Sequence, residues 1–160
     1  MIRDINTKDA KEICDIYNHY VLNTIVTFEE TAVPDEEMKT RIEKITEKLP
    51  WIVFEENKHI IGYAYASEWK SRCAYKHSLE TTVYLRNGQE GNGIGSLLYE
   101  ELIARLKTNH YHAAIGGISL PNEASIALHE KFGFEKIGQF KEVGYKFDKW
   151  IDVGYWELIL

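Results

Sequence analysis

The sequence predicts a single mixed α/β domain over residues 1–160. With 160 residues, 44% of them hydrophobic and 28% charged, the chain has the size and composition of one globular domain with a buried core. Runs with the alternation typical of strands are interspersed with runs whose apolar residues recur at helical spacing. No repeat, low-complexity segment or linker divides the chain.

The first half of the chain predicts a short strand, two helices and a hairpin. Residues 2–5 suit the strand, and Thr7 is expected to be the N-cap of the helix that follows. The apolar faces of the two helices are Ala10, Ile13, Cys14, Tyr17 and Val21, and then Met38, Ile42, Ile45 and Leu49. Residues 51–54 and 60–66 suit two strands, and their closeness favours an antiparallel hairpin.

The second half predicts two more helices and the remaining strands. A polar stretch, residues 67–78, precedes the first of these strands. The strands are expected at residues 80–85, 112–118, 137–147 and 155–160. The helices are expected at residues 94–106 and 122–131, and Gly133 supplies a helix-ending residue after the second.

Charge and cysteine content exclude several functions. A formal net charge of −6 argues against a broad nucleic-acid surface, although it leaves room for a local basic pocket for one anionic cofactor. Cys14 and Cys73 fit a reduced compartment, and neither they nor the histidines have metal-ligand spacing. No segment suits a membrane span, and residues 1–6 lack the long apolar run of a signal peptide. We therefore expect a cytoplasmic protein with no metal.

The most informative segment is a β-branched strand, a loop rich in glycine and an amphipathic helix, residues 80–102. Where a glycine-rich loop opens a helix, several backbone N–H groups lack an intrahelical partner, and the helix dipole adds positive potential. This combination suits phosphate. The sequence therefore predicts that residues 91–96 bind a phosphorylated ligand.

The spacing of the glycines separates three kinds of phosphate loop. A Walker A loop requires a lysine after its last glycine, and none follows Gly95. A dinucleotide-binding loop requires Gly-x-Gly-x-x-Gly after the first strand of a βαβ unit. Here Gly91, Gly93 and Gly95 are evenly spaced, and the loop lies past the middle of the chain. Both of these kinds are disfavoured.

The remaining pattern resembles the GNAT superfamily of N-acetyltransferases, whose motif Gln/Arg-x-x-Gly-x-Gly/Ala opens a helix. Residues 90–95 match it, with Glu90 in place of the usual Gln or Arg. Residues 122–134 are similar to the family's Asn-x-x-Ala/Ser…Tyr-Glu-Lys-x-Gly-Phe helix. Within the superfamily the chain looks like the phosphinothricin N-acetyltransferases and the related enzymes for methionine sulfone and sulfoximine. The segments that carry this likeness are residues 62–66, 72–75, 80–85, 128–134 and 146–153.

The resemblance implies the GNAT fold, a central mixed, mostly antiparallel twisted sheet flanked by helices, with strands splayed at the cofactor site. It implies acetyl-CoA as co-substrate and transfer of its acetyl group to the α-amino group of a small amino acid or analogue. Direct attack in a ternary complex, without a covalent acyl-enzyme, is the expected mechanism. The resemblance also implies a homodimer, for which residues 150–160 are a candidate interface.

Three groups of residues are expected to bind the cofactor. The pyrophosphate is assigned to the loop, Gly91, Asn92, Gly93, Ile94, Gly95 and Ser96. By resemblance, the backbone of Val83, Tyr84 and Leu85 holds the pantetheine arm and the acetyl carbonyl, although these residues also suit an ordinary buried strand. Asn122 is assigned to the pantetheine amides, with Ser125 as a companion, and an N-cap is the alternative role for Asn122.

Two residues are the candidates for proton transfer. Strand alternation places Glu80, Thr82 and Tyr84 on one face. Beside the cofactor cleft, partial desolvation is expected to raise the pKa of the Glu80 carboxylate and make it the candidate base, and an exposed carboxylate at the end of a strand is the alternative. His129 occupies the position where many superfamily members carry a tyrosine that protonates the departing thiolate, and a helix-packing histidine is the alternative.

The acceptor side is assigned by residue type. Arg72 and Lys76 suit an α-carboxylate, and Phe28, Tyr63 and Tyr75 suit the walls of a side-chain pocket, with solvated cations and core aromatics as the alternatives. Two other functions stay open. One is a GNAT enzyme for a polyamine, an aminoglycoside or a protein N-terminus, and the other is a coenzyme A-binding sensor without catalysis.

Overall fold

Seven strands form one sheet in the order β1-β2-β3-β4-β5-β7-β6, in a computed structural model that describes residues 1–160. The strands are β1 (Ile2–Asp4), β2 (Trp51–Glu56), β3 (His59–Glu68), β4 (Ser78–Leu85), β5 (Ala113–Ser119), β6 (Glu135–Lys146) and β7 (Lys149–Ile159). Every neighbouring pair is antiparallel except β4 and β5. The predicted mixed, mostly antiparallel sheet is confirmed.

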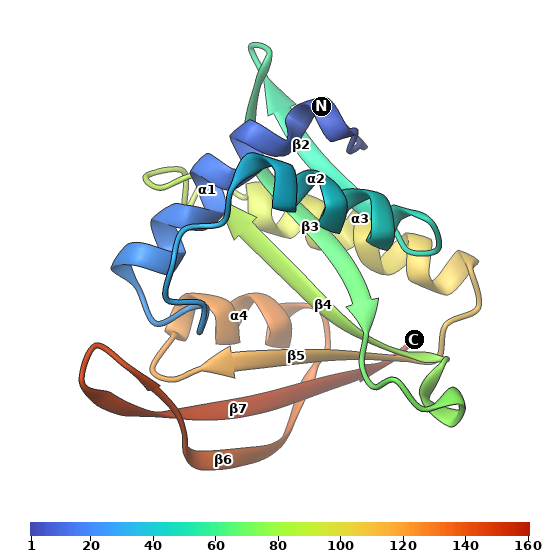
Figure 1. Ribbon diagram of the computed structural model, residues 1–160. Coiled ribbons are helices and arrows are strands. Elements are labelled where there is room, and N and C mark those ends of the chain that lie inside the picture. Colours follow the sequence, from blue (N-terminus) through green and yellow to red (C-terminus); the bar gives the residue numbers. More distant parts are fainter.

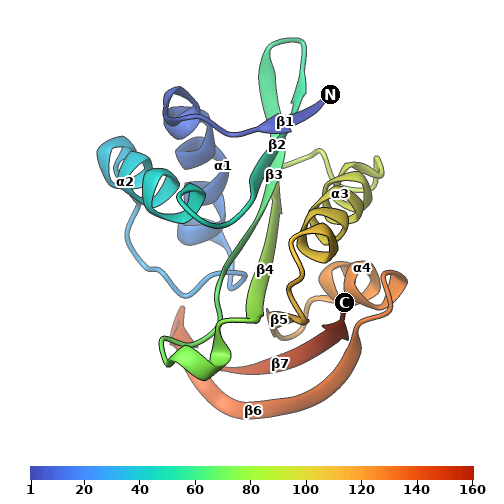
Figure 2. The ribbon, with the colours of Figure 1, turned by 90° about the vertical axis from the view of Figure 1, so that its right-hand side faces the viewer.

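Two helices cover each face of the sheet (Figure 1). Figure 2 shows α1 (Ala10–Asn23) and α2 (Asp35–Thr46) on one side of the strands, and α3 (Ile94–Thr108) and α4 (Glu123–Lys131) on the other. The sheet therefore separates two hydrophobic cores of 15 buried residues each. None of the α-helices has the length and apolar surface that a membrane span requires.

Two predicted boundaries are wrong for local reasons. The chain enters α1 through a 3-10 turn, Thr7–Asp9, and Asn6 rather than Thr7 caps it. The Asn6 side chain accepts from the backbone N–H of Lys8 at 2.9 Å. The backbone N–H of Asn6 donates to Asp9 Oδ2 at 2.9 Å. This reciprocal pair is a capping box. Strand β7 begins at Lys149 rather than at residue 155, because Phe147 and Asp148, at φ +52° and +58°, make a tight hairpin turn directly after β6.

The alternation predicted for β4 is confirmed. Tyr84 packs with the α1 and α2 core, whereas Val83 and Leu85 pack with the α3 core. Side chains on successive residues of a strand point to opposite faces. Glu80 therefore lies on the same face as Tyr84.

The strands β4 and β5 separate soon after they meet. They pair in parallel over only three residues each, the last pair being Glu80 with Ile115. Beyond this pair β4 remains hydrogen-bonded to β3 as far as Leu85. Figure 1 shows β4 and β5 diverging from their shared end. The predicted splay is therefore present, and we refer to its closed end, at Glu80 and Ile115, as the fork.

Candidate active site

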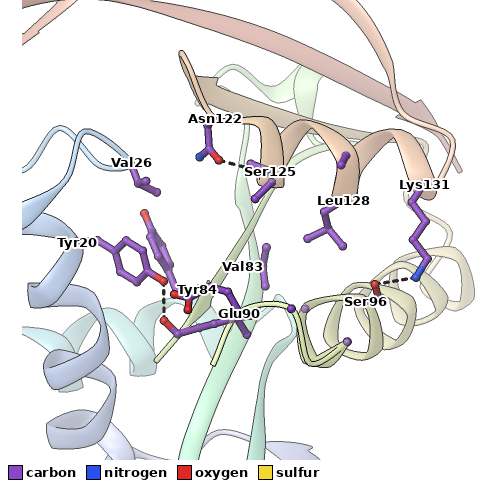
Figure 3. Close-up of a pocket in the computed structure, with 16 residues that line it drawn as sticks. Tyr20, Val26, Val83, Tyr84, Glu90, Ser96, Asn122, Ser125, Leu128 and Lys131 are labelled. Carbon is purple, nitrogen blue, oxygen red and sulfur yellow. Dashed lines mark hydrogen bonds between the residues drawn. The ribbon is translucent and has the colours of Figure 1, made fainter. Parts of the chain in front are cut away.

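A cavity of about 520 Å³ lies at the open end of the splay, between α1, the end of β4, the glycine loop and the helices α3 and α4 (Figure 3). All of the residues predicted to bind the cofactor line it, except Asn92 and Ile94. The remaining lining residues, which the sequence reasoning did not assign to the cofactor, are Tyr20, Val26, Glu90, Ala124, Ala127, Leu128 and Lys131.

The backbone of β4 turns hydrogen-bonding groups toward this cavity. The N–H of Arg86 donates to the carbonyl of Ile61 in β3 at 2.7 Å. Because residues in an antiparallel ladder alternate between bonded and non-bonded pairs, Val83 and Leu85 direct their N–H and C=O groups away from β3. They point into the gap that β5 leaves open. An extended ligand with its own amide groups can pair with these atoms as a further strand does.

The glycine loop presents the free N-terminus of α3. Gly91 and Gly93 have φ of +82° and +78°, a region that side-chain-bearing residues rarely adopt. Gly93 is the N-cap of α3, and no side chain caps the helix. The N–H groups of the first turn are therefore left for an anion, which the helix dipole also favours.

One lysine completes the loop's positive character. Lys131, at the end of α4, donates from Nζ to Ser96 Oγ at 2.9 Å and is the only cationic residue in the cavity lining. Arg86, the nearest arginine along the chain, is instead occupied by Glu12 and by the carbonyl of Ile60. The sequence indicates only that a helix ends near Lys131. The contact with Ser96 joins residues 35 positions apart, so residue spacing does not reveal it.

Glu80 lies at the fork, on the α1 and α2 face of the sheet. Its side chain is partly buried, and burial raises its pKa while the Lys70 charge opposes the rise. A Cβ built on Gly117 of β5 would lie 3.5 Å from Glu80 Oε1 and 3.2 Å from the Tyr155 ring. The bare backbone of Gly117 thus lets the Glu80 carboxylate and the Tyr155 ring pack close to β5.

His129 lies on the opposite face of the sheet from Glu80 and is only 4% exposed. Its Nδ1 lies 2.7 Å from the carbonyl oxygen of Ser125, which can only accept, so Nδ1 carries the proton. Burial lowers the pKa of His129, and the bond to Ser125 partly offsets this. In the neutral ring Nε2 then accepts from the Tyr99 hydroxyl at 2.7 Å.

This chain of hydrogen bonds continues toward the fork. The Tyr99 hydroxyl lies 2.8 Å from Thr81 Oγ1, and Thr81 directly follows Glu80 in β4. His129 is not among the residues that line the cavity. Its ring therefore packs in the core, and its direct link to the cavity lining is the hydrogen bond to the carbonyl of Ser125.

The structure scatters the predicted acceptor residues. Tyr63 is 1% exposed and packs against Trp51 and Tyr84, which corrects the expectation that it lines an acceptor pocket. Strand alternation cannot reveal that other aromatic side chains bury the Tyr63 ring in the core. Phe28 is 41% exposed, with its ring against Gly144 of β6.

The other predicted acceptor residues lie away from the cavity. Arg72, Tyr75 and Lys76 line a separate hollow of about 310 Å³ at the other end of β4.

Asn122 has its alternative role as an N-cap and also lies at the cavity. Its Oδ1 caps α4 by accepting from the N–H of Ser125 at 3.1 Å, and its side chain also lines the cavity. The amide nitrogen of Asn122 is therefore free to donate to a ligand.

No nucleophile in the cavity has a base beside it. Burial raises the pKa of Cys14 to about 12, with further contributions from Asp35, and Cys73 lies in the separate hollow. Ser125 Oγ is 3.5 Å from His129 Nδ1, but that nitrogen already donates to the Ser125 carbonyl. No three His, Cys, Asp or Glu side chains gather as metal ligands.

Comparisons with known proteins agree with this geometry. Residues 2–154 match the family model described as an acetyltransferase (GNAT) domain. A phosphinothricin N-acetyltransferase of Streptomyces coelicolor is 41% identical over 154 residues, 94% of this chain and 90% of that protein. An L-methionine sulfoximine/L-methionine sulfone acetyltransferase of Salmonella typhimurium is 33% identical over 161 residues, 99% of this chain and 94% of that protein.

A solved structure is also very similar. It is that of a GNAT superfamily phosphinothricin acetyltransferase from Sinorhizobium meliloti in complex with acetyl-CoA. Its TM-score is 0.97 at 36% identity, and the match covers 100% of this chain and 88% of that one. The arrangement of strands and helices around the splay is therefore shared with a protein that was solved with this thioester bound.

Proposed function

The chain belongs to the GNAT acetyltransferase family, and on that premise we propose that it transfers the acetyl group of acetyl-CoA to the α-amino group of a small amino acid or a close analogue. The observation that carries the proposal is the fork. At the open end of the splay, a cavity offers a phosphate loop and free strand amides. At the fork lies a carboxylate whose pKa is raised. The names of the relatives support the choice of an amino acid as acceptor.

Acetyl-CoA fits the cavity by chemistry. The amides of the glycine loop and Lys131 suit the diphosphate, and the N–H and C=O groups of Val83 and Leu85 suit the two amides of the pantetheine arm. The free nitrogen of Asn122 adds a donor for a pantetheine carbonyl. An arm that follows β4 from Leu85 toward the fork brings its thioester close to Glu80.

Direct transfer then needs one proton acceptor and one proton donor. Glu80 removes a proton from the α-ammonium, and the free amine attacks the thioester carbonyl. The carbon–sulfur bond breaks, and coenzyme A leaves as the thiolate. The new amide nitrogen gives up its second proton, the thiolate takes up one through solvent, and Glu80 releases its proton to solvent. The lack of a cysteine or serine nucleophile with a base beside it supports this route over a covalent acyl-enzyme.

The position of His129 supports its alternative role, that of a packing histidine, over proton transfer to the thiolate. A neutral His129 does not reach the cavity, but it accepts from Tyr99 and so fixes the Tyr99 hydroxyl beside Thr81. Tyr99 and Thr81 do not line the cavity either, so we assign the protonation of the thiolate to the amide nitrogen and solvent rather than to this group of hydrogen bonds. The hydrogen bonds among Ser125, His129, Tyr99 and Thr81 also satisfy the buried polar atoms of the last three side chains.

The test of the function is a thiol-release assay with acetyl-CoA over three groups of amines. The first contains phosphinothricin, methionine sulfone, methionine sulfoximine and common amino acids, the second polyamines and aminoglycosides, and the third short peptides. Turnover confined to the first group is the expected result. Turnover of the second or third group alone overturns the acceptor assignment, and acetyl-CoA binding with no turnover of any amine indicates a sensor.

Lys131 gives a prediction about the phosphate end. Lys131→Met is expected to raise the KM for acetyl-CoA about 3- to 10-fold at low salt, because an exposed charge-assisted contact to phosphate is lost. The difference from wild type should shrink as salt is added and screens this charge. Steady-state kinetics at two ionic strengths measure both effects. Lys107→Met, an exposed lysine in the last turn of α3, is the matched control, and an unchanged KM for Lys131→Met at low salt contradicts the assignment.

We further propose a second copy of the chain as partner, through the outer face of β6 and the start of β7. Six large apolar side chains there are more than half exposed: Ile137, Phe140, Val143, Tyr145, Phe147 and Trp150. Exposed apolar side chains gathered on one hairpin in this way are typical of an interaction site. It lies mainly on β6, so the predicted interface at residues 150–160 covers only its edge.

The oligomeric state tests this interface. Light scattering after size exclusion is expected to give a dimer for the wild type and a monomer for Val143→Asp, since the charge must be desolvated in an apolar contact. Leu22→Asp, which changes an exposed apolar residue at the end of α1, should leave the dimer intact. A wild-type monomer, or a dimer that survives Val143→Asp, contradicts the proposed interface.

A further inference from the structure

Lys146, near the end of β6, is a lysine that the fold buries. It is 3% exposed, although lysine side chains are almost never buried unless they are paired. Its ammonium forms no ion pair with a carboxylate. Burial lowers the pKa of Lys146, and the charge of Glu30 only partly opposes this. A buried cation without a carboxylate partner lowers the stability of the fold, so stability does not explain this lysine.

The Lys146 ammonium instead holds the α1–α2 segment, residues 24–34. Its Nζ donates to the backbone carbonyl oxygen of Thr27 at 2.7 Å. On the same inner face of β6, Gly144 lies against the ring of Phe28, since a Cβ on Gly144 would lie 2.4 Å from the ring atom Cζ. Figure 1 and Figure 2 both show this segment beside the turn that joins β6 to β7. Two contacts therefore join it to β6.

Helices α1 and α2 hold the same segment from the other side of the splay. The Thr27 hydroxyl lies 2.8 Å from that of Tyr17 on α1. Arg41 on α2 donates to both carboxylate oxygens of Glu29, at 2.9 and 2.7 Å. Because α1 packs with β4, whereas β6 reaches the sheet through β7 and β5, the α1–α2 segment spans the open end of the splay. Lys146 completes this span.

The α1–α2 segment borders the site on the face that carries Glu80. Val26 lines the cavity, and Figure 3 shows it near Tyr84. The Tyr17 ring, whose hydroxyl meets Thr27, packs edge-on to the Tyr84 ring with centroids 5.3 Å apart. Tyr84 and Glu80 lie on one face of β4. An amine that Glu80 deprotonates therefore meets the thioester in the space between the fork and this segment.

We propose that Lys146 is a positioning residue for the acceptor, because it ties residues 26–28 to β6 and so fixes one wall of the space beside Glu80. This rests on the proposed function, because it assumes that Glu80 deprotonates the acceptor. Lys146 touches neither substrate in this role. Its function is the N–H that it places on the Thr27 carbonyl, so a side chain of similar length without a donor fills the same volume but leaves the wall free to move.

The first test is Lys146→Met, which keeps most of the apolar stem and removes the donor. The acceptor is phosphinothricin, or the amino acid or analogue that the wild type turns over fastest in the thiol-release assay. Its KM is expected to rise about 3- to 10-fold, the value of one hydrogen bond, with kcat changed by less than about twofold. The KM for acetyl-CoA should not rise with it, because the glycine loop and the β4 backbone keep their positions.

Thermal stability gives a readout that separates positioning from packing. Because Lys146→Met removes a buried cation, the thermal midpoint is expected to stay at or above that of the wild type. A lysine that only supported the fold would lower the midpoint on substitution and leave both KM values unchanged. Lys149→Met is the matched control, since Lys149 lies opposite Lys146 in the hairpin but is exposed. Light scattering checks that the variants keep the oligomeric state of the wild type.

The second test displaces the same segment without changing Lys146. In Gly144→Ala the methyl group would lie 2.4 to 3.0 Å from three Phe28 ring atoms, so this exposed ring must move away from β6. The acceptor KM should rise as in Lys146→Met, and the double variant should raise it by less than the product of the two single effects. Gly138→Ala, also in β6, is the matched control, because its Cβ would meet nothing within 4 Å.

Three results overturn the inference. They are an unchanged acceptor KM in Lys146→Met, an equal rise in the KM values for the acceptor and for acetyl-CoA, and effects of Lys146→Met and Gly144→Ala that multiply fully in the double variant. A wild type that acetylates no amine refutes the proposed function instead. A wild type that acetylates an amino acid, with Lys146→Met and Gly144→Ala unaffected, refutes only the positioning role.

Discussion

Glu80→Gln is expected to lower kcat/KM for acetyl transfer by about 100- to 10,000-fold, the usual contribution of a positioned acid or base. The amide has nearly the shape of the carboxyl group but does not take a proton from an ammonium group. Glu80 lies at the fork, where β4 and β5 last pair and where its carboxylate lies beside the bare backbone of Gly117. Affinity for acetyl-CoA should change little, because Glu80 does not line the cofactor cavity.

The pH dependence of kcat/KM tests whether Glu80 is the group that must be ionised. Burial raises the pKa of Glu80, and a base must be ionised to act, so wild-type kcat/KM should fall as the pH drops through this raised value. The acidic limb therefore lies above about 4.3, the ordinary value for Glu. In Glu80→Gln this limb should be absent. A wild-type limb near the ordinary value contradicts the assignment.

The free energy of unfolding distinguishes a loss of activity in Glu80→Gln from a loss of folded protein. A carboxyl whose pKa is raised in the folded state favours folding in its protonated form. That contribution is complete below the unfolded pKa and is lost as the pH rises through the folded one. Glutamine stays neutral, so Glu80→Gln should be at least as stable as the wild type at neutral pH. Glu56→Gln, at the exposed end of β2, is the matched control. Unchanged turnover in Glu80→Gln excludes it as the base.

The parts of the site that the sequence predicted are those encoded by short segments. The glycines at positive φ, the uncapped start of α3 and the alternation along β4 each depend on a few consecutive residues. Local propensity and period are legible in one sequence for such features. They were enough to predict most of the residues that the structure brings together around the cavity.

The residues that were missed or misplaced depend on packing between distant segments. Tyr20 reaches Leu85 from another element, and Lys131 reaches Ser96 from the far end of α4. Tyr63 shares the face of Tyr84, but only the position of α1 decides that its ring is buried rather than exposed to a substrate. His129 has the residue type of a proton donor, and its partners Tyr99 and Ser125 direct it into the core. Apart from the pair Ser125 and His129, four residues apart in α4, none of these contacts has a signal in residue spacing.

Two adjacent glycines of β5 give the last prediction, because they face opposite sides of the fork. Gly116→Ala is expected to lower the free energy of unfolding by about 2–4 kcal/mol, from overpacking and the loss of buried hydrogen bonds. A Cβ there would lie 2.4 Å from His129 Nε2, and the ring, held by Tyr99 and Ser125, has no room to move. Denaturant titration measures the change.

Gly117→Ala is the matched variant, with the same substitution one residue later. Its Cβ would meet the Tyr155 ring at 3.2 Å and Glu80 Oε1 at 3.5 Å, at an exposed position where the ring can shift by a few tenths of an ångström. Its cost in stability should stay within about 1 kcal/mol. The methyl group instead fills space beside the base, so the KM for the acceptor should rise while that for acetyl-CoA does not. Equal destabilisation by the two changes contradicts the packing of His129 against Gly116. An unchanged acceptor KM in Gly117→Ala means that the amine does not approach Glu80 from this face.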